Sequence, residues 1–234
     1  MAQPAPTWFP RSKLQPPRPR GDLLARRRLL EPLRGALQRA RLILISAPAG
    51  AGKTTLLASL LASLAEGAGE CAPTNAAPSM AWVSLDVDDN DVARLLAVLL
   101  AAFEQLAPGA GAAADSIAAA LGAAEADRSG QARQAVALLI NAVLAAPAAP
   151  GLLVLDDLHT LVEPAALAAL EYLIEQLPAH ITLAVAATHD PPLPLARLRA
   201  RRELLELRLP ELRFTSAETA GLLTDCLDLP LAAE

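Results

Sequence analysis

The chain has 234 residues, of which 53% are hydrophobic but only 3% aromatic, so its core must be built from leucine, alanine and valine. This length is sufficient for one well-buried domain with a small appendage, and the net charge of -5 excludes a general nucleic-acid-binding bias. The two cysteines, Cys71 and Cys226, are far apart without metal-ligand spacing, which favours a reducing cytoplasm.

The first forty residues are predicted to form an extended segment and a helix. Residues 1–20 are rich in proline and arginine and lack the apolar core of a secretory signal, so we expect them to lie extended along the surface. Residues 21–40 carry apolar side chains at helical spacing. We therefore treat 1–40 as one N-terminal unit that precedes the main domain.

Strands and helices are predicted to alternate along the rest of the chain. The predicted strands are 41–46, 81–86, 152–157, 181–188 and 204–209. The predicted helices are about 53–65, 92–106, 131–146 and 164–177, with a last one beginning at 215. Residues 66–80 and 107–115 are predicted to be breaks, and 190–202 an irregular loop with a short helix. This alternation predicts an α/β fold with a five-stranded parallel sheet covered on both faces.

One uncharged stretch, residues 135–155, is long enough to suggest a membrane span. Pro147, Pro150 and Gly151 interrupt it, and Asn141 lies inside it. We interpret the stretch as a buried helix, a turn and a buried strand, and keep a membrane span as the alternative.

The sequence APAGAGKT, residues 47–54, has the spacing of a P-loop, with Ala47 in place of the first glycine. It follows a predicted strand and opens a predicted helix, so backbone N–H groups and the helix N-terminus would both face a phosphate. The alternative is a glycine–alanine turn without a ligand, which leaves the GKTT sequence unexplained. The predicted nucleotide-binding residues of this loop are Gly50, Ala51, Gly52, Lys53, Thr54 and Thr55.

Two residues of the loop are predicted to act on the chemistry. Lys53 would reach the β- and γ-phosphates and is a candidate catalytic residue. The Thr54 hydroxyl would ligate Mg²⁺. Thr55 is less determined, because it would either touch the α-phosphate or cap the turn.

A second acidic motif, LLVLDDLH, covers residues 152–159 and ends an apolar strand with two carboxylates. Asp156 is predicted to hold Mg²⁺, because nucleotide-bound magnesium prefers carboxylate or water oxygens. Asp157 is predicted to polarise the attacking water as a general base. The alternative is a solvated acidic turn, and His159 is interpreted as a packing or turn residue.

Six stretches in order resemble the nucleotide-binding domain of STAND signal-transduction ATPases, among the MalT-like, large LuxR-type regulators. They begin with KLQPPRPRGDLLARRRLLEPL and LILISAPAGAGKTTLLASLLA, continue with AWVSLDVDDND and LLVLDDLHTL, and end with DPPLPLARLRARRELLELR and LRFTSAETAGLL. The resemblance implies a P-loop NTPase three-layer sandwich whose fourth strand lies between the first and third. It places an NTPase domain at 41–211 and the first part of a helical lid at 212–234.

The resemblance also implies a function. ATP and ADP, with Mg²⁺, would act as a switch: ADP is bound at rest, ATP promotes self-association, and slow hydrolysis resets the state. Arg20, Leu24 and Arg26 would help cover the base and ribose, and their alternative is a solvated basic helix. DNA binding would belong to a domain outside these residues, because nothing here resembles a recognition helix with a basic face.

The sequence departs from the family pattern after the fourth predicted strand. The family commonly has a γ-phosphate-sensing arginine two residues before DPP, where this chain has Thr188 with His189 beside it. Both are candidate phosphate sensors, but a hydroxyl brings no charge and histidine is mostly neutral at pH 7. One of the arginines at 197, 199 and 201 could substitute, or they form an exposed basic helix.

A further acidic run, residues 86–91, lacks the spacing of a calcium loop. We expect it to cap the helix that begins near Asp91, with a supporting role near Mg²⁺ for Asp86 as the alternative.

Three functions remain open at this point. The first is an Mg-ATP/ADP-binding switch domain of a MalT-like cytoplasmic transcriptional regulator, with weak ATPase activity. The second is an AAA-like ATPase with steady turnover. The third is a nucleotide-binding scaffold with little or no hydrolysis, which the threonine at 188 favours.

Overall fold

A computed structural model describes residues 9–17, 24–37, 39–67, 78–122 and 127–226. Its centre is a five-stranded parallel sheet in the order β2-β3-β4-β1-β5. The strands are β1 (Leu42–Ser46), β2 (Ser79–Ser84), β3 (Gly151–Asp156), β4 (Ile181–Ala187) and β5 (Leu204–Arg208). β4 lies between β1 and β3, which confirms the strand order that the family resemblance implied.

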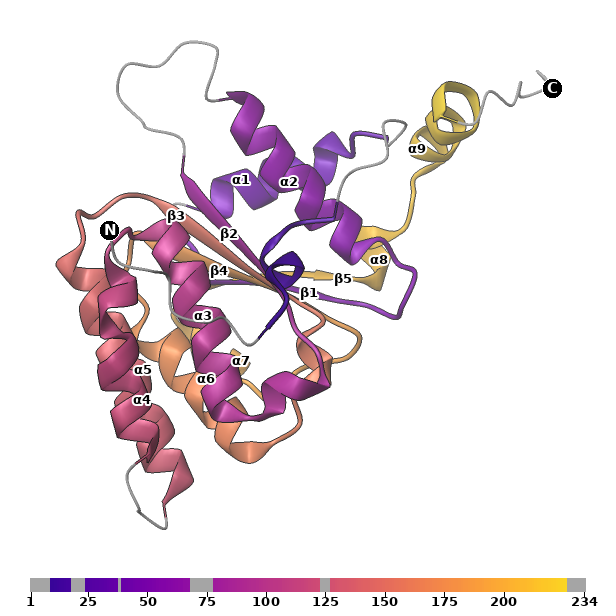
Figure 1. Ribbon diagram of the computed structural model, residues 1–234. Helices are drawn as coiled ribbons and strands as arrows, with labels where there is room; N and C mark the ends of the chain where they lie inside the picture. The colour runs from indigo at the N-terminus through magenta and orange to yellow at the C-terminus, as the bar shows by residue number, and fades with distance from the viewer. Residues whose placement is uncertain (1–8, 18–23, 38, 68–77, 123–126, 227–234) are drawn as a thin grey trace.

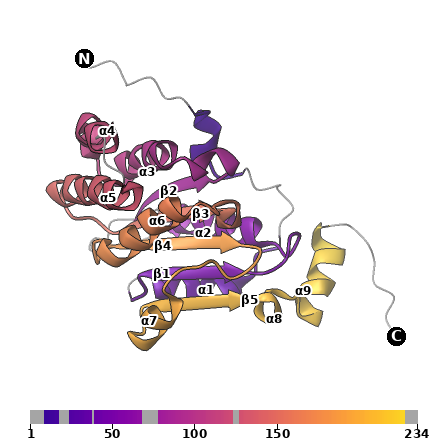
Figure 2. The ribbon, with the colours of Figure 1, turned by 90° about the horizontal axis from the view of Figure 1, so that it is seen from below.

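Helices cover both faces of the sheet (Figures 1 and 2). Successive residues of β1 point to opposite faces: Leu42 and Leu44 belong to one core, Ile43 and Ile45 to the other. The first core includes α3 (Val92–Leu106), α5 (Arg128–Ala145) and α6 (Pro164–Gln176), and the second α1 (Arg27–Ala36) and α2 (Lys53–Gly67). The α/β three-layer prediction is therefore confirmed.

Shorter elements complete the fold. The remaining α-helices are α4 (Ala114–Gly122), α7 (Leu195–Ala200), α8 (Leu209–Leu212) and α9 (Ser216–Gly221), the last followed by a π-helical turn, Leu222–Cys226. The 3-10 turns are Arg11–Leu14, Val87–Asn90, Ala110–Ala113 and Leu158–Thr160. Figure 1 shows α9 projecting away from the sheet and its covering helices.

The glycine- and alanine-rich stretch 107–115, predicted to be a break, is partly helical. It forms a 3-10 turn and the start of α4, which packs against α5. The Glu104 carboxylate accepts hydrogen bonds from the backbone N–H groups of Gly109 and Gly111 and so fixes the turn. Alanine is the strongest helix former, so the helix forms here although its sequence has little hydrophobic contrast.

One other prediction is corrected near the N-terminus, and one alternative is settled in the middle of the chain. Residues 11–14 are not extended but form a 3-10 turn, and Lys13 within it is buried. The uncharged stretch 135–155 is the end of α5, a connection and β3. None of the described helices is long and apolar enough to span a membrane. Arg20 and Cys71 lie outside the described residues.

Candidate functional site

The loop between β1 and α2 has the backbone that phosphate binding requires. Gly50 and Gly52 have φ angles of 79° and 82°, a conformation that other residues rarely adopt, and a Cβ on either would meet no atom within 4 Å. Glycine is therefore needed here for its backbone freedom and not for space. Ala47 is buried, and its φ angle is not positive. Alanine therefore fits at the position where the P-loop pattern has its first glycine.

Lys53 is the first residue of α2 and is only 6% exposed. Its Nζ atom donates hydrogen bonds to the carbonyl oxygens of Ala47 at 2.8 Å and Pro48 at 3.1 Å, both in the same loop. The ammonium group is thus held against the loop by two carbonyl groups, and its charge also acts on the Asp156 carboxylate. A phosphate oxygen offers a stronger, charge-assisted partner at the same place.

The predicted magnesium ligands lie together at the carboxyl ends of the strands. The Thr54 side chain hydrogen-bonds the Asp156 carboxylate, and the Asp157 N–H donates to Asp156 at 3.1 Å. Asp156 is 3% exposed, and this burial raises its pKa above the ordinary value. A divalent cation would offset the cost of that buried charge, and a hydroxyl with a carboxylate is a suitable oxygen donor pair for Mg²⁺. Among the described residues no group of three or more His, Cys, Asp or Glu could hold a metal ion, so other ligands would come from the nucleotide and water.

Asp157 differs from its neighbour in backbone and exposure. Its φ and ψ angles are 58° and 37°, in the left-handed region that aspartate tolerates better than most residues. Its side chain is 51% exposed, so it is accessible to water as a general base must be. The His159 Nδ1 atom lies 3.9 Å from the Asp157 Oδ1 atom.

Two histidines that follow β3 and β4 lie close to each other. The His159 and His189 rings are 6.2 Å apart, edge to face, and the Thr188 hydroxyl lies 3.0 Å from the His189 Nδ1 atom. The buried His159 Nδ1 atom has no hydrogen-bond partner. Thr188 and His189 thus follow β4, and the His189 ring lies edge to face with His159, two residues after Asp157. Their role as phosphate sensors stays a prediction. The arginines of α7 are occupied elsewhere, Arg197 by Glu175 and Arg199 by Glu206.

A cavity of about 600 Å³ opens beside the phosphate loop. This volume is within the usual range of small-molecule sites. The cavity is lined by residues from three parts of the chain: Leu24, Arg26, Gly50, Ala51, Gly52, Thr55, Leu56, Ser59, Leu209, Leu212, Arg213, Phe214 and Leu222. Its apolar walls suit a flat base, and its floor is the loop that would hold the phosphates. Leu24 and Arg26 line this cavity, and their role in covering the base and ribose stays a prediction.

Part of this wall was missed by reasoning from sequence. Phe214 stacks under Arg26, whose guanidinium carbon lies 4.4 Å from the ring centre, and both line the cavity. Arg26 and Arg28 also bind the Glu218 carboxylate and the Arg213 carbonyl oxygen. The one sequence signal for this wall was the stretch LRFTSAETAGLL, which is part of the family resemblance.

Glu218 ties α9 to the start of α1, and this contact predicts a pH dependence. Burial alone would raise the pKa of Glu218, but hydrogen bonds from Arg28, the Thr215 N–H and Arg26 lower it to about 2. Because the folded pKa is below the unfolded value of about 4.3, the stabilisation is complete above about pH 4.5 and is lost as the pH falls toward 2. We expect Glu218→Gln to lower the urea midpoint at pH 7, with a difference from wild type that shrinks below pH 4.5. A difference that stays constant from pH 7 to pH 3 would contradict this assignment.

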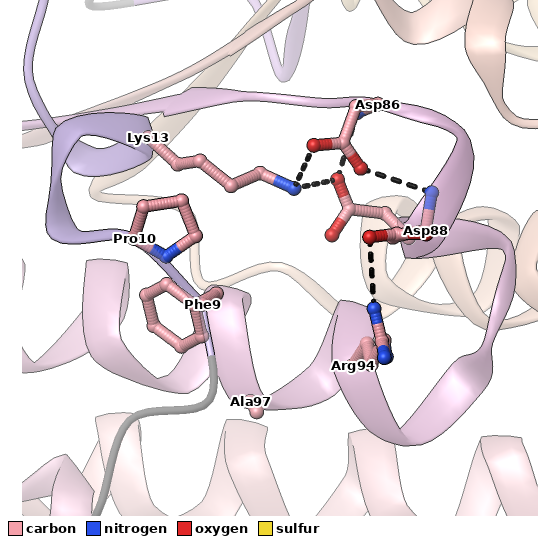
Figure 3. Close-up of a pocket in the computed structure, with 8 residues that line it drawn as sticks. Phe9, Pro10, Lys13, Asp86, Asp88, Arg94 and Ala97 are labelled. Carbon is pink, nitrogen blue, oxygen red and sulfur yellow. Dashed lines mark hydrogen bonds and ion pairs between the residues drawn. The ribbon is translucent and has the colours of Figure 1, made fainter.

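The acidic run 86–91 forms a separate cluster, shown in Figure 3. Lys13 Nζ lies 2.9 Å from Asp86 and 2.5 Å from Asp89, whose side chains are 52% and 1% exposed. Asp91 accepts a hydrogen bond from the Arg94 N–H and caps α3, which confirms the expected helix cap. Asp86 is engaged by Lys13, so the alternative of a role near Mg²⁺ is not supported. The cluster fastens the N-terminal turn to the sheet.

Comparisons with known proteins agree with this geometry. Residues 22–186 match the AAA ATPase domain family. The HTH-type transcriptional regulator MalT of Cronobacter sakazakii is 34% identical over 212 residues, which cover 88% of this chain but only 21% of that protein. A Walker-type ATPase of Pyrococcus abyssi is 11% identical, with a TM-score of 0.46 over 93% of this chain and 63% of the other. A Drosophila ORC chain, determined with AT-rich DNA and Cdc6, is 14% identical, with a TM-score of 0.43 over 83% and 59%.

The family match spans well over half of the chain and includes β1, the phosphate loop, β3 with its acidic end, and most of β4. The site has the features that a nucleotide-binding ATPase domain needs: loop glycines with positive φ angles, the buried Lys53, and the paired Thr54 and Asp156. The chain therefore belongs to the AAA ATPase domain family.

Proposed function

We propose that this chain is the Mg-ATP/ADP-binding switch domain of a transcriptional regulator similar to MalT, with slow ATP hydrolysis that resets the signalling state. The observation that carries the proposal is the presence of three features around one loop: the buried Lys53, the Thr54–Asp156 pair, and a cavity of about 600 Å³ lined by glycines of the loop. The similarity to MalT supports the regulatory context, although the chain spans about a fifth of that protein. In this proposal the chain lies in the cytoplasm and self-associates when ATP is bound, and DNA is bound by another domain.

Each residue has a defined task in the proposed site. The N–H groups of the loop around Gly50 and Gly52 would cradle the phosphate oxygens, and Lys53 would neutralise the β- and γ-phosphates. Thr54 and Asp156 would hold Mg²⁺, which supplies charge neutralisation for the phosphates when bound. Asp157 would orient a water and accept its proton. Arg26 and Phe214 would cover the base, and α9 would be the beginning of the helical lid.

Slow hydrolysis is proposed because no arginine stands at the end of β4. Thr188 and His189 interact with each other there, and the neighbouring arginines of α7 are paired with carboxylates. A guanidinium group would stabilise the charge that spreads over the transferring phosphoryl group. Neither Arg197 nor Arg199 is free to supply this contribution in the described structure. This observation favours the switch over a steadily turning-over ATPase.

We expect Thr188→Arg to increase steady-state ATP hydrolysis at least about tenfold, because an arginine contact to the phosphoryl group is among the largest single contributions in such sites. Thr188→Gln is the control, since it adds length without charge, and it is expected to leave the rate unchanged. The measurement is phosphate release at saturating Mg-ATP, with affinity determined separately. A rate in Thr188→Arg no higher than in Thr188→Gln would refute the missing arginine as the cause. Fast hydrolysis by the wild-type chain would favour the steady ATPase instead.

A further inference from the structure

A chain of polar contacts beside the phosphate loop has Asp190 at its centre. The Asp190 Oδ1 atom accepts hydrogen bonds from the Ser46 hydroxyl at 3.0 Å and from one Arg208 nitrogen at 2.8 Å. Its Oδ2 atom accepts from the other Arg208 nitrogen at 2.9 Å. Ser46 and Arg208 are paired across β1 and β5, whereas Asp190 follows β4. One carboxylate therefore joins the carboxyl ends of three adjacent strands.

The contact to Ser46 acts on the root of the phosphate loop. Ser46 is the last residue of β1 and is buried, and Ala47 after it begins the loop. The Ala47 N–H donates to the Ala187 carbonyl at 3.2 Å, and the Ala47 carbonyl accepts from Lys53 Nζ at 2.8 Å. The root is thus held by the pairing of Ser46 with β4 and β5, by the Ala47 N–H bond to β4, and by one side-chain bond to Asp190. A shift of Ser46 would move the carbonyl that places Lys53.

Asp190 is itself held in position from two sides. Proline at 191 restricts the backbone before it to extended conformations. Arg208 binds it with both terminal nitrogens, a geometry that fixes direction as well as distance, and Glu206 holds Arg208 from the other side at 2.8 Å. The Arg208 guanidinium, together with the Ser46 hydroxyl, lowers the pKa of Asp190, so the carboxylate is charged at neutral pH.

The ion pair of Arg208 and Asp190 is too exposed to contribute much to the stability of the fold. The side chains of Arg208 and Asp190 are 41% and 48% exposed, and ion pairs in such positions contribute only about 0–1 kcal/mol to folding. The same carboxylate lies two residues after Thr188, in the segment that follows β4. Its contacts therefore join this segment to the end of β1, where the phosphate loop begins.

We propose that Asp190 is a positioning residue for the phosphate loop: held by Arg208, it fixes Ser46 and through it the loop that carries Lys53. This proposal rests on the proposed nucleotide site. It adds Asp190, Ser46 and Arg208 to the residues on which nucleotide affinity depends, although none of them would touch the nucleotide.

The test compares Asp190→Asn, Asp190→Glu and Ser46→Ala with a matched control, Glu206→Gln. The control removes the other carboxylate from Arg208 but leaves the contact between Asp190 and Ser46 in place. Affinity for ADP is measured by calorimetry in the presence of Mg²⁺, and the thermal unfolding midpoint is measured without nucleotide. The full chain is used throughout.

We expect Asp190→Asn to raise the Kd for ADP about tenfold, because small displacements of a binding loop have large effects on its contacts. Ser46→Ala should show part of this loss, Asp190→Glu should recover most of it, and Glu206→Gln should stay within about twofold of wild type. The unfolding midpoints should be equal. The proposal is overturned if Asp190→Asn binds ADP like wild type, if Glu206→Gln loses as much affinity, or if the loss comes with a matching fall in midpoint. Failure of the wild-type chain to bind ADP would instead overturn the proposed function.

Discussion

Replacing Lys53 by alanine is expected to weaken ADP binding roughly 10- to 100-fold while the protein stays folded. A hydrogen bond to a charged group contributes about 1.5–3 kcal/mol, and each 1.4 kcal/mol changes affinity about tenfold. Lys53 donates its hydrogen bonds to carbonyl groups of its own loop, so its removal breaks no hydrogen bond to the buried Asp156, although it removes a positive charge that acts on that carboxylate. The Kd for ADP and for ATP should be measured by calorimetry, with the unfolding midpoint determined on the same samples without nucleotide.

The chain contains its own control, because its only other lysine is Lys13. Lys13 lies in the cluster with Asp86 and Asp89, in another pocket from the phosphate loop. A Lys13 variant that is still folded should therefore bind ADP like wild type. Unchanged nucleotide affinity in Lys53→Ala would show that the assigned site is wrong.

Replacing Lys13 by methionine is expected to destabilise the fold by about 3–5 kcal/mol, because removal of one partner of a buried ion pair leaves the other charge uncompensated. Asp89, which is 1% exposed, would retain only the hydrogen bond from the Asp86 N–H. Methionine keeps the length and apolar stem of lysine, so packing changes little. The free energy of unfolding should be measured by urea titration at pH 7.

Two further variants isolate the charge in this cluster. Arg11 belongs to the same 3-10 turn but is exposed, so Arg11→Met is expected to change stability by less than about 0.5 kcal/mol. Adding Asp89→Asn to Lys13→Met should recover much of the loss, because the buried group is then neutral. Equal unfolding free energies for Lys13→Met and Arg11→Met would contradict the role of the buried pair.

The layered fold was predictable because its determinants are local. β1 and β3 are continuous apolar runs, as strands buried on both faces must be, and each ends in the polar residues of the site. The glycines at 50 and 52 predict a backbone conformation that few other residues adopt. The helix at 114–122 was not predicted, because alanine-rich sequence shows little difference between buried and exposed faces and its turn depends on Glu104.

Contacts between distant segments were not predictable in the same way. The cavity wall combines Arg26 and Phe214, which are 188 residues apart and meet only when α9 is fastened to α1. Lys13 stands in a proline- and arginine-rich segment that looks solvated, yet two aspartates of the loop after β2 bury it. Arg208 has no local signal that separates it from the arginines of α7, and its importance follows from strand pairing with Ser46.

We propose that the folded chain binds one Mg-nucleotide between the phosphate loop and the wall formed by 209–214. The most direct test of this claim is a calorimetric titration of the nucleotide-free chain with ADP in the presence of Mg²⁺. We predict saturable binding of one ADP per chain. Absence of saturable binding of both ADP and ATP to the folded chain would contradict the claim.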